Sequence, residues 1–322
     1  MQHVEAIIVG GGPCGLSAAI ELQNIGIKPI VIEKGNVVNA IYNYPTHQTF
    51  FSSSEKLAIG DVPFLIEERK PRRNQALVYY REVVKMKEIQ VNRFEKVESV
   101  VKEDSGLFTV KTDKEVYCTP YVILATGYYD QPNYMDISGE DLPKVFHYFK
   151  EAHPFFDTDV LVIGGKNSAV DAALELRKAK ARVTVAYRGG DYSPKVKPWI
   201  LPEFASLVKN DEIAMHFNTL VKEIRENEVV LLVEGEEKVI TNDFVFAMTG
   251  YHPNHGLIRS MGVNIDEETG RPHFDPETME TNIENLFIAG VLAAGNNANE
   301  IFIENGRFHG EYIAKSIMSK KN

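Results

Sequence analysis

The sequence predicts an α/β fold with two Rossmann-like, three-layer dinucleotide-binding domains, the second inserted in the first. Two glycine-rich loops support this, because each lies between an apolar strand and a helix. Two further strands end in similar small-residue turns, Ala125-Thr126-Gly127 and Met248-Thr249-Gly250. The 322 residues suffice for two domains of ordinary size. We expect one domain to comprise residues 1–128 and 254–322, and the inserted domain to comprise residues 129–253.

The first loop is Gly10-Gly11-Gly12-Pro13-Cys14-Gly15. We expect an apolar strand before it at residues 4–9, and a helix at residues 13–25 whose apolar residues recur at helical spacing. A second strand, at residues 27–32, ends at Glu33. Strand, loop, helix, strand and terminal acid together indicate a dinucleotide site, whereas the glycines alone would also fit a plain turn.

Each glycine of this loop has a physical task. Gly10 makes the tight turn, Gly12 lets the backbone approach a pyrophosphate, and Gly15 lets the helix pack closely on the strand. The helix N-terminus favours the negative charge of the phosphates. We expect Glu33 to accept hydrogen bonds from ribose hydroxyls.

The same pattern returns at mid-chain with a different ending. A strand at residues 159–163 precedes the loop Gly164-Gly165-Lys166-Asn167-Ser168-Ala169, and a helix at residues 170–178 follows it. The next strand, at residues 182–186, ends in Tyr187-Arg188 and not in an acid. An acid there would repel a ribose 2′-phosphate, whereas an arginine can pair with it. The second site should therefore prefer NADPH over NADH.

Four cations near this loop leave alternatives open. Lys166 stands where a glycine is usual, so its side chain either contacts the pyrophosphate or packs on the surface. Lys195 and Lys197 either add positive charge to the site or are solvated surface residues, and the second alternative applies to Arg188 as well.

Composition narrows the partners and the compartment. A formal net charge of −10 argues against nucleic acid and gives no sign of membrane attraction. No apolar stretch is long enough to span a membrane, and the first strand begins too early for a signal peptide. Two cysteines form no disulfide framework and fit the reducing cytoplasm. No His, Cys and carboxylate cluster has metal-ligand spacing, so we expect no metal.

The order of these motifs resembles the two-dinucleotide flavoprotein oxidoreductases, and within them the thioredoxin reductase-like group, over the whole chain. The resemblance implies FAD in the first domain and NADPH in the inserted one. The implied FAD-binding residues are Gly10, Gly12, Pro13, Gly15, Glu33, Lys34, His47, Ala125, Thr126, Gly127, Gly290, Glu300 and Ile301. The implied NADPH-binding residues are Gly164, Lys166, Asn167, Ser168, Ala169 and Arg188.

The chain departs from that group in two respects. It lacks the Cys-x-x-Cys pair of the inserted domain, so it should not reduce thioredoxin by that route. A strand at residues 285–289 ends in Gly290-Val291, where the group has Gly-Asp with an Asp that holds a ribityl hydroxyl. Valine cannot accept that hydrogen bond, and Asn296, Asn297 and Asn299 are the candidates to replace it. One helix is expected after these residues, at 301–318.

Less common segments carry a more specific resemblance, to the bacillithiol-disulfide reductases. They are Gly11 to Cys14, residues 44–52, Gly165 to Ser168, residues 187–192 and Ala289-Gly290-Val291. The match implies that NADPH reduces FAD and that these electrons reduce the disulfide of the small thiol bacillithiol. It also implies that Cys14 forms a mixed disulfide with the substrate, and that the protein is a homodimer or a larger assembly.

The chemistry of Cys14 alone leaves two interpretations open. A helix N-terminus lowers a thiol pKa and so favours a nucleophilic thiolate, but a pyrophosphate at the same helix end would raise that pKa again. Cys14 could equally be a small side chain in a tight place. Cys118 begins a strand and is expected to be a packing residue. Residues 42–51, which include His47, either line a flavin or substrate pocket or form a packed surface loop.

Other functions fit the same motifs. A ferredoxin or flavodoxin NADP reductase would pass single electrons and need no cysteine. A flavin monooxygenase would hydroxylate an apolar substrate. A redox-sensing or scaffold protein would bind the nucleotides without turnover, but the second loop and Arg188 oppose this, because hydride supply is their simplest use.

Overall fold

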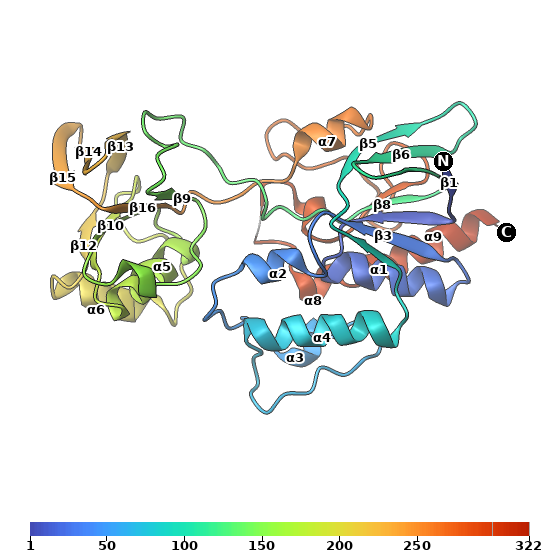
Figure 1. The fold of residues 1–322 in the computed structure, drawn as a ribbon, viewed down its shortest axis with the longest axis horizontal. Helices are drawn as coiled ribbons and strands as arrows, with labels where there is room; N and C mark the ends of the chain where they lie inside the picture. The colour runs from blue at the N-terminus through green and yellow to red at the C-terminus, as the bar shows by residue number, and fades with distance from the viewer. Residues whose placement is uncertain (298, 322) are drawn as a thin grey trace. The chain divides into compact units, whose positions relative to one another are not determined.

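The computed structural model describes residues 1–297 and 299–321 and divides into two compact units (Figure 1). Unit 1 comprises Met1–Gln131 and Tyr251–Asn322, and unit 2 comprises Pro132–Gly250. The chain therefore leaves unit 1 after Gln131 and returns at Tyr251. Each unit holds its own mainly parallel sheet flanked by helices, which confirms the predicted α/β fold class.

The central sheet of unit 1 is parallel, with strand order β17-β8-β2-β3-β4. Its strands are β2 (Ala6–Val9), β3 (Pro29–Glu33), β4 (Val91–Arg93), β8 (Val122–Leu124) and β17 (Leu286–Ile288). All residues of β2, β3, β8 and β17 are buried. Because this parallel sheet is buried on both faces, its strands are continuous apolar runs and not alternating ones.

A second, mixed sheet explains why the predicted strand at residues 4–9 is wrong at its start. Its order is β1-β7-β6-β5, formed by β1 (Gln2–His3), β5 (Val97–Lys102), β6 (Phe108–Thr112) and β7 (Val116–Thr119). The chain begins beside β7, where the Val4 N–H donates to the Cys118 carbonyl at 3.0 Å, and joins the central sheet only at Ala6. Cys118 is buried, as a packing residue should be.

The helix that opens at the first loop, α1 (Pro13–Asn24), packs against the C-terminal helix, α9 (His309–Lys321). A Cβ on Gly310 would lie 2.7 Å from the Ala18 Cα, so only glycine permits this approach. The other helical segments of unit 1 are α2 (Asn39–Asn43), α3 (Ser54–Leu57), α4 (Arg73–Met86), α7 (His255–Ser260), η2 (Gly290–Ala294) and α8 (Ile303–Gly306).

The single helix expected at residues 301–318 is wrong, because the chain forms α8 and α9 with a break between them. At the break, the Arg307 carbonyl accepts a hydrogen bond from the Ser17 hydroxyl at 2.6 Å. The Arg307 guanidinium donates to the carbonyl oxygens of Glu55 and Ala58. These tertiary hydrogen bonds hold Arg307 at the break between the two helices. The helical spacing of apolar residues in the sequence cannot reveal them.

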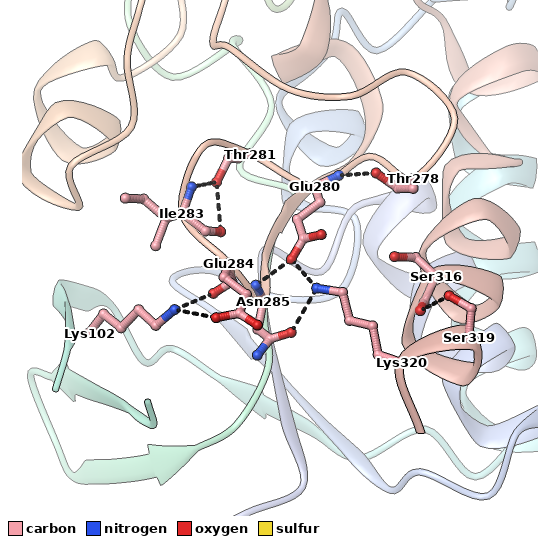
Figure 2. A network of polar contacts seen from close by, with 10 residues as sticks. All are labelled: Lys102, Thr278, Glu280, Thr281, Ile283, Glu284, Asn285, Ser316, Ser319 and Lys320. Atoms are coloured by element: carbon pink, nitrogen blue, oxygen red, sulfur yellow. Dashed lines mark hydrogen bonds and ion pairs between the residues drawn. The ribbon is translucent and has the colours of Figure 1, made fainter. Parts of the chain in front are cut away.

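A polar network holds the segment that leads into β17 (Figure 2). The Glu280 Oε1 atom accepts from the Asn285 backbone N–H at 2.6 Å and pairs with Lys320, whose ammonium also donates to the Asn285 Oδ1 at 3.1 Å. Lys102 of β5 donates to the Glu284 carbonyl at 3.0 Å. These contacts attach the end of α9 and strand β5 to the residues before β17.

Unit 2 repeats the parallel arrangement with strand order β12-β11-β10-β16-β9. Its strands are β9 (Val145–Phe146), β10 (Asp159–Ile163), β11 (Arg182–Ala186), β12 (Ala214–His216) and β16 (Phe244–Ala247). An antiparallel sheet adds β13 (Thr219–Ile224), β14 (Glu228–Val233) and β15 (Glu236–Thr241), and the helical segments are η1 (His153–Phe155), α5 (Asn167–Lys178) and α6 (Leu201–Lys209). The strands predicted at 159–163 and 182–186 are confirmed at both ends.

Candidate functional site

The glycines of the first loop divide into two kinds. A Cβ on Gly10, which has φ +112°, would lie 2.4 Å from the Ala125 carbonyl oxygen, and a Cβ on Gly15 would lie 2.1 Å from the Gly10 carbonyl oxygen. A Cβ on Gly12 would meet no atom of the described residues within 4 Å. Gly10 and Gly15 are therefore required for internal packing, whereas Gly12 leaves open space at the start of α1. That opening is a cradle that fits a pyrophosphate.

Glu33 closes the loop from the end of β3. Its two carboxylate oxygens accept hydrogen bonds from the backbone N–H groups of Gly11, at 2.8 Å, and Gly35, at 2.7 Å. Burial raises the pKa of Glu33, and these two hydrogen bonds oppose that rise. Each carboxylate oxygen has a second lone pair, so ribose hydroxyls could still donate to it. The neighbouring Lys34 pairs with Asp130 at 2.9 Å.

Cys14 is the second residue of α1, and its sulfur faces the C-terminal part of unit 1. A Cβ built on either Gly290 or Gly306 would lie 3.0 Å from the Cys14 Sγ, and the one on Gly306 would lie 3.1 Å from the Ile301 Cγ2. Burial raises the pKa of the Cys14 thiol to about 12. For the protein alone, desolvation of the thiolate therefore opposes the lowering of this pKa that a helix N-terminus favours.

Two tyrosines, Tyr44 and Tyr80, lie near Cys14. Burial raises the pKa values of Tyr44 and Tyr80, and the charge of an ionised Cys14 adds to both shifts. The Tyr44 ring packs edge-on against Tyr129 at 5.1 Å between centroids. The Tyr80 hydroxyl donates to the Leu57 carbonyl at 2.8 Å. The aromatic segment 42–51 pointed to Tyr44, but Tyr80 lies within α4 and had no signal in the sequence.

His309 is the second contributor that sequence reasoning missed. Gly290, with φ +73°, donates its backbone N–H to the His309 Nδ1 at 3.1 Å. Burial lowers the pKa of His309 to about 4, so the imidazole is neutral at pH 7 and can accept this hydrogen bond. His309 thereby holds the glycine turn that lies against Cys14. An isolated histidine at the start of a helix gives no such indication in the sequence.

Of the other residues expected at FAD, Ala125 lies against this loop, because its carbonyl oxygen is the atom that a Cβ on Gly10 would approach. Ala125, Thr126 and Gly127 follow β8, and a Cβ on Gly127 would again meet nothing within 4 Å among the described residues. His47 is exposed in a turn closed by a hydrogen bond from the Gln48 N–H to the Pro45 carbonyl at 3.0 Å.

The C-terminal segment uses its polar side chains internally. Val291 lies in η2 and offers no acceptor. Glu300 pairs with Arg271 at 2.5 Å and accepts from the Asn297 amide at 3.2 Å. The Asn305 amide donates to the Glu300 carbonyl at 2.9 Å. If the Asn297 side chain holds the ribityl hydroxyl in place of an aspartate at position 291, this role competes with the hydrogen bond from its amide to Glu300.

The second loop has the same backbone frame as the first. A Cβ on Gly164, which has φ +134°, would lie 2.6 Å from the Met248 carbonyl oxygen, and a Cβ on Gly165 would lie 2.4 Å from the Tyr187 ring. Ala169 is buried against the core of unit 2, whereas Ser168 is exposed. The loop thus packs on the turn after β16 and on the residue after β11.

Three cationic residues of unit 2, Lys166, Arg188 and Lys195, lie near this loop. Lys166 and Arg188 follow the paired strands β10 and β11, so they lie at the same edge of the sheet. Burial lowers the pKa of Lys166, and the positive charges of Lys195 and Arg188 lower it further. Three neighbouring cations favour an anionic ligand with more than one charge, such as a ribose 2′-phosphate beside a pyrophosphate.

Among the helices that the structure describes, none is both long enough and apolar enough to cross a membrane.

The sequence profile of the pyridine nucleotide-disulphide oxidoreductases matches residues 7–290. Bacilliredoxin reductase Bdr of Bacillus subtilis (strain 168) is 68% identical over 324 residues, which cover 100% of both chains. The solved bacillithiol disulfide reductases Bdr of Staphylococcus aureus and Bacillus cereus superpose with TM-scores of 0.96 and 0.97 at 62% and 66% identity, and cover at least 99% of this chain and 100% of theirs. Thioredoxin reductase of T. acidophilum, at 21% identity and a TM-score of 0.78, shares the fold.

Proposed function

The chain belongs to the pyridine nucleotide-disulphide oxidoreductase family and is an oxidoreductase, and we propose that it is an NADPH-dependent FAD flavoprotein that reduces bacillithiol disulfide. Relatives named for this substrate match it over its full length. The observation that carries the proposal is the position of Cys14, which places a thiol within the first nucleotide loop and against Gly290 and Gly306. The sequence contains no Cys-x-x-Cys pair that could reduce the disulfide instead of Cys14.

Unit 1 supplies the residues proposed to hold FAD. Gly12 and Gly127 provide the open backbone, and Glu33 provides acceptors for the ribose. The remaining proposed contacts are Gly10, Pro13, Gly15, Lys34, His47, Ala125, Thr126, Gly290, Glu300 and Ile301. Bound there, the flavin would relay two electrons from the nicotinamide nucleotide toward the disulfide.

Unit 2 supplies the residues proposed to hold NADPH. The loop Gly164 to Ala169 would face the pyrophosphate at the N-terminus of α5. Arg188 would pair with the ribose 2′-phosphate, since it stands where an NAD site has an acid. Lys166 lies close enough to Arg188 for their charges to interact, so it would add to the same site.

The proposed reduction of the disulfide needs Cys14 as its only protein nucleophile. The Cys14 sulfur bonds to one sulfur of the substrate disulfide, and the S–S bond of the substrate breaks. The proton of Cys14 ends on the sulfur that leaves as the first thiol. Two electrons and one proton then break the mixed disulfide, which releases the second thiol, and another proton restores the Cys14 thiol. Because the Cys14 pKa is about 12 in the protein alone, deprotonation is the step that the bound state must favour.

We also propose that the protein acts in the cytoplasm as a homodimer or a larger symmetric assembly. The chain has only two cysteines, and the second is buried as a packing residue. Light scattering of the purified protein measures the assembly, and a monomer at micromolar concentration would contradict that part of the proposal.

The test compares Cys14→Ala with the matched variant Cys118→Ala. Purified protein should oxidise NADPH faster when bacillithiol disulfide is added. Cys14→Ala should lower this stimulation at least ~100-fold, because a nucleophile is lost, while flavin reduction by NADPH persists. Cys118→Ala should keep the stimulation, since this thiol lies in β7.

Two results would contradict the proposal. Normal disulfide turnover by Cys14→Ala would exclude the mixed-disulfide mechanism. NADPH oxidation that responds to ferredoxin or to oxygen, and not to the disulfide, would indicate a ferredoxin–NADP reductase or a monooxygenase.

A further inference from the structure

The side-chain amide of Asn167 is occupied by the protein itself. Its Nδ2 donates to the Lys195 carbonyl at 3.0 Å, and its Oδ1 accepts from the Lys197 backbone N–H at 2.9 Å. Asn167 is the first residue of α5, at the loop expected to face the pyrophosphate. The family resemblance implies that Asn167 binds NADPH, and these contacts add that its side-chain amide bridges to a second segment of unit 2.

That segment is the turn Ser193 to Lys197, between β11 and α6. Val196 is 5% exposed and packs in the core of unit 2, and its N–H donates to the Ser193 carbonyl at 3.0 Å. The Lys195 N–H donates to the Ser193 Oγ at 3.3 Å, while the Lys195 side chain is exposed. The core anchors one face of the turn and Asn167 holds the other, so the backbone position of Lys195 is set from both sides.

The turn brings Lys195 to the two cations at the edge of the sheet. Strands β10 and β11 pair in register, with Ile163 opposite Ala186, which places Lys166 and Arg188 at neighbouring strand ends. The hydrogen bond to the Lys195 carbonyl ties Lys195 to Asn167, the residue after Lys166. Burial lowers the pKa of Lys166, and the positive charges of Lys195 and Arg188 lower it further. Holding three cations together is unfavourable unless an anion joins them.

We propose that Asn167 is a positioning residue that sets the preference for the 2′-phosphorylated nicotinamide nucleotide, because it holds Lys195 beside Lys166 and Arg188. This inference rests on the proposed function, in which unit 2 takes NADPH. Asn167 lies on the pyrophosphate loop, and Lys195 lies on the side of the 2′-phosphate. The bridge therefore joins the part of the site common to all dinucleotides to the part that discriminates between them.

Isothermal titration of the flavin-loaded protein with adenosine 2′,5′-bisphosphate and with 5′-AMP isolates the 2′-phosphate. The wild type should bind the bisphosphate ~10–100-fold more tightly, the value of one or two charge-assisted hydrogen bonds. Lys195→Gln should lower this ratio several-fold. Asn167→Ala should lower it by a similar factor while AMP still binds, which reports a folded unit 2.

A double-mutant cycle separates positioning from a general structural role. If Asn167 acts through Lys195, Asn167→Ala combined with Lys195→Gln should give the same ratio as either single variant. Lys180→Gln is the matched charge control, because it removes an exposed lysine beyond the other end of α5, and it should leave the ratio unchanged.

The outcomes distinguish the two claims. A wild type that binds both ligands equally would overturn the NADPH preference in the proposed function. A wild-type preference that Lys195→Gln lowers and Asn167→Ala leaves intact would overturn only the role of Asn167. Additive effects in the double variant, or an equal loss of both ligands in Asn167→Ala, would also overturn that role.

Discussion

The two glycine-rich loops share a backbone frame and differ in chemistry. In each, the first glycine has a positive φ and packs on the carbonyl of a small-residue turn, Ala125 for Gly10 and Met248 for Gly164. The next strand then ends in Glu33 in unit 1 and in Tyr187-Arg188 in unit 2. We propose that the shared frame suits each loop to a dinucleotide and that these side chains discriminate between the two dinucleotides.

A second difference concerns the third position and the first turn of the helix. The first loop has Gly12 and then Cys14, with open backbone at Gly12 and a half-buried thiol whose pKa is raised. The second has Lys166 and then Asn167, which bridges to another cation-bearing turn. In the proposed function, the first loop would combine nucleotide binding with thiol chemistry, and the second would combine it with recognition of negative charge.

The largest expected effect tests the shared frame. Gly10→Ala and Gly164→Ala each force a left-handed residue against a carbonyl oxygen, so each should destabilise its own unit by more than ~3 kcal/mol. Gly10→Ala should lose flavin, measured from the visible spectrum. Gly164→Ala should keep flavin and lose nucleotide affinity, measured by titration. Loss of flavin from both variants would show that the frames are not independent.

The next effect concerns how the stability of unit 1 depends on pH. The pKa of His309 is lowered to about 4, so its contribution to the stability of unit 1 is present above pH 6.5 and is lost as the pH falls toward 4. The loss should reach about 3 kcal/mol. His309→Asn keeps an acceptor for Gly290 without titrating, so it should abolish this loss. Hydrogen exchange of α1 and α9 measures it, and equal acid sensitivity in the variant would contradict the account.

Asp171 of α5 should behave in the opposite way in unit 2. Burial raises its pKa to about 6, so its cost is absent below its unfolded value and grows as the pH rises through 6. Asp171→Asn should therefore stabilise unit 2 at pH 7 and have little effect at pH 4. Hydrogen exchange of α5 at the two pH values tests this, and an equal effect at both would exclude the assignment.

A smaller effect is expected at Arg188, which follows β11 where the corresponding strand of unit 1 ends in Glu33. Arg188→Gln should reduce the preference for NADPH over NADH by ~10–100-fold, since a charge-assisted hydrogen bond to the 2′-phosphate is lost. The ratio of kcat/KM for the two nucleotides measures it. An unchanged ratio would move the recognition of the 2′-phosphate away from Arg188.

Sequence patterns predicted the repeated strands and loops well, because parallel buried strands and glycine turns are local signals. The strand at 182–186 and the loop after β2 show this, whereas the helix predicted at 170–178 already begins at Asn167. The break between α8 and α9 could not be predicted, because it depends on contacts of Arg307 with Ser17 and residues near α3.

The candidate site shows the same limit. The sequence identified Cys14 and Asn167 as candidate site residues, but it gave neither the raised pKa of the thiol nor the protein partners of the Asn167 amide. Desolvation and long-range hydrogen bonds decide both, and neither has a local pattern. His309 was missed for the same reason, since its partner Gly290 lies in another element.

Trapping of the mixed disulfide tests the central claim most directly. Bacillithiol disulfide is added to the enzyme without nicotinamide nucleotide, and the protein is digested and analysed by mass spectrometry. The account predicts one bacillithiol on the peptide that holds Cys14, formed faster at pH 9 than at pH 7 because the thiol is protonated at neutral pH. An unmodified Cys14, or an adduct on Cys118 alone, would contradict it.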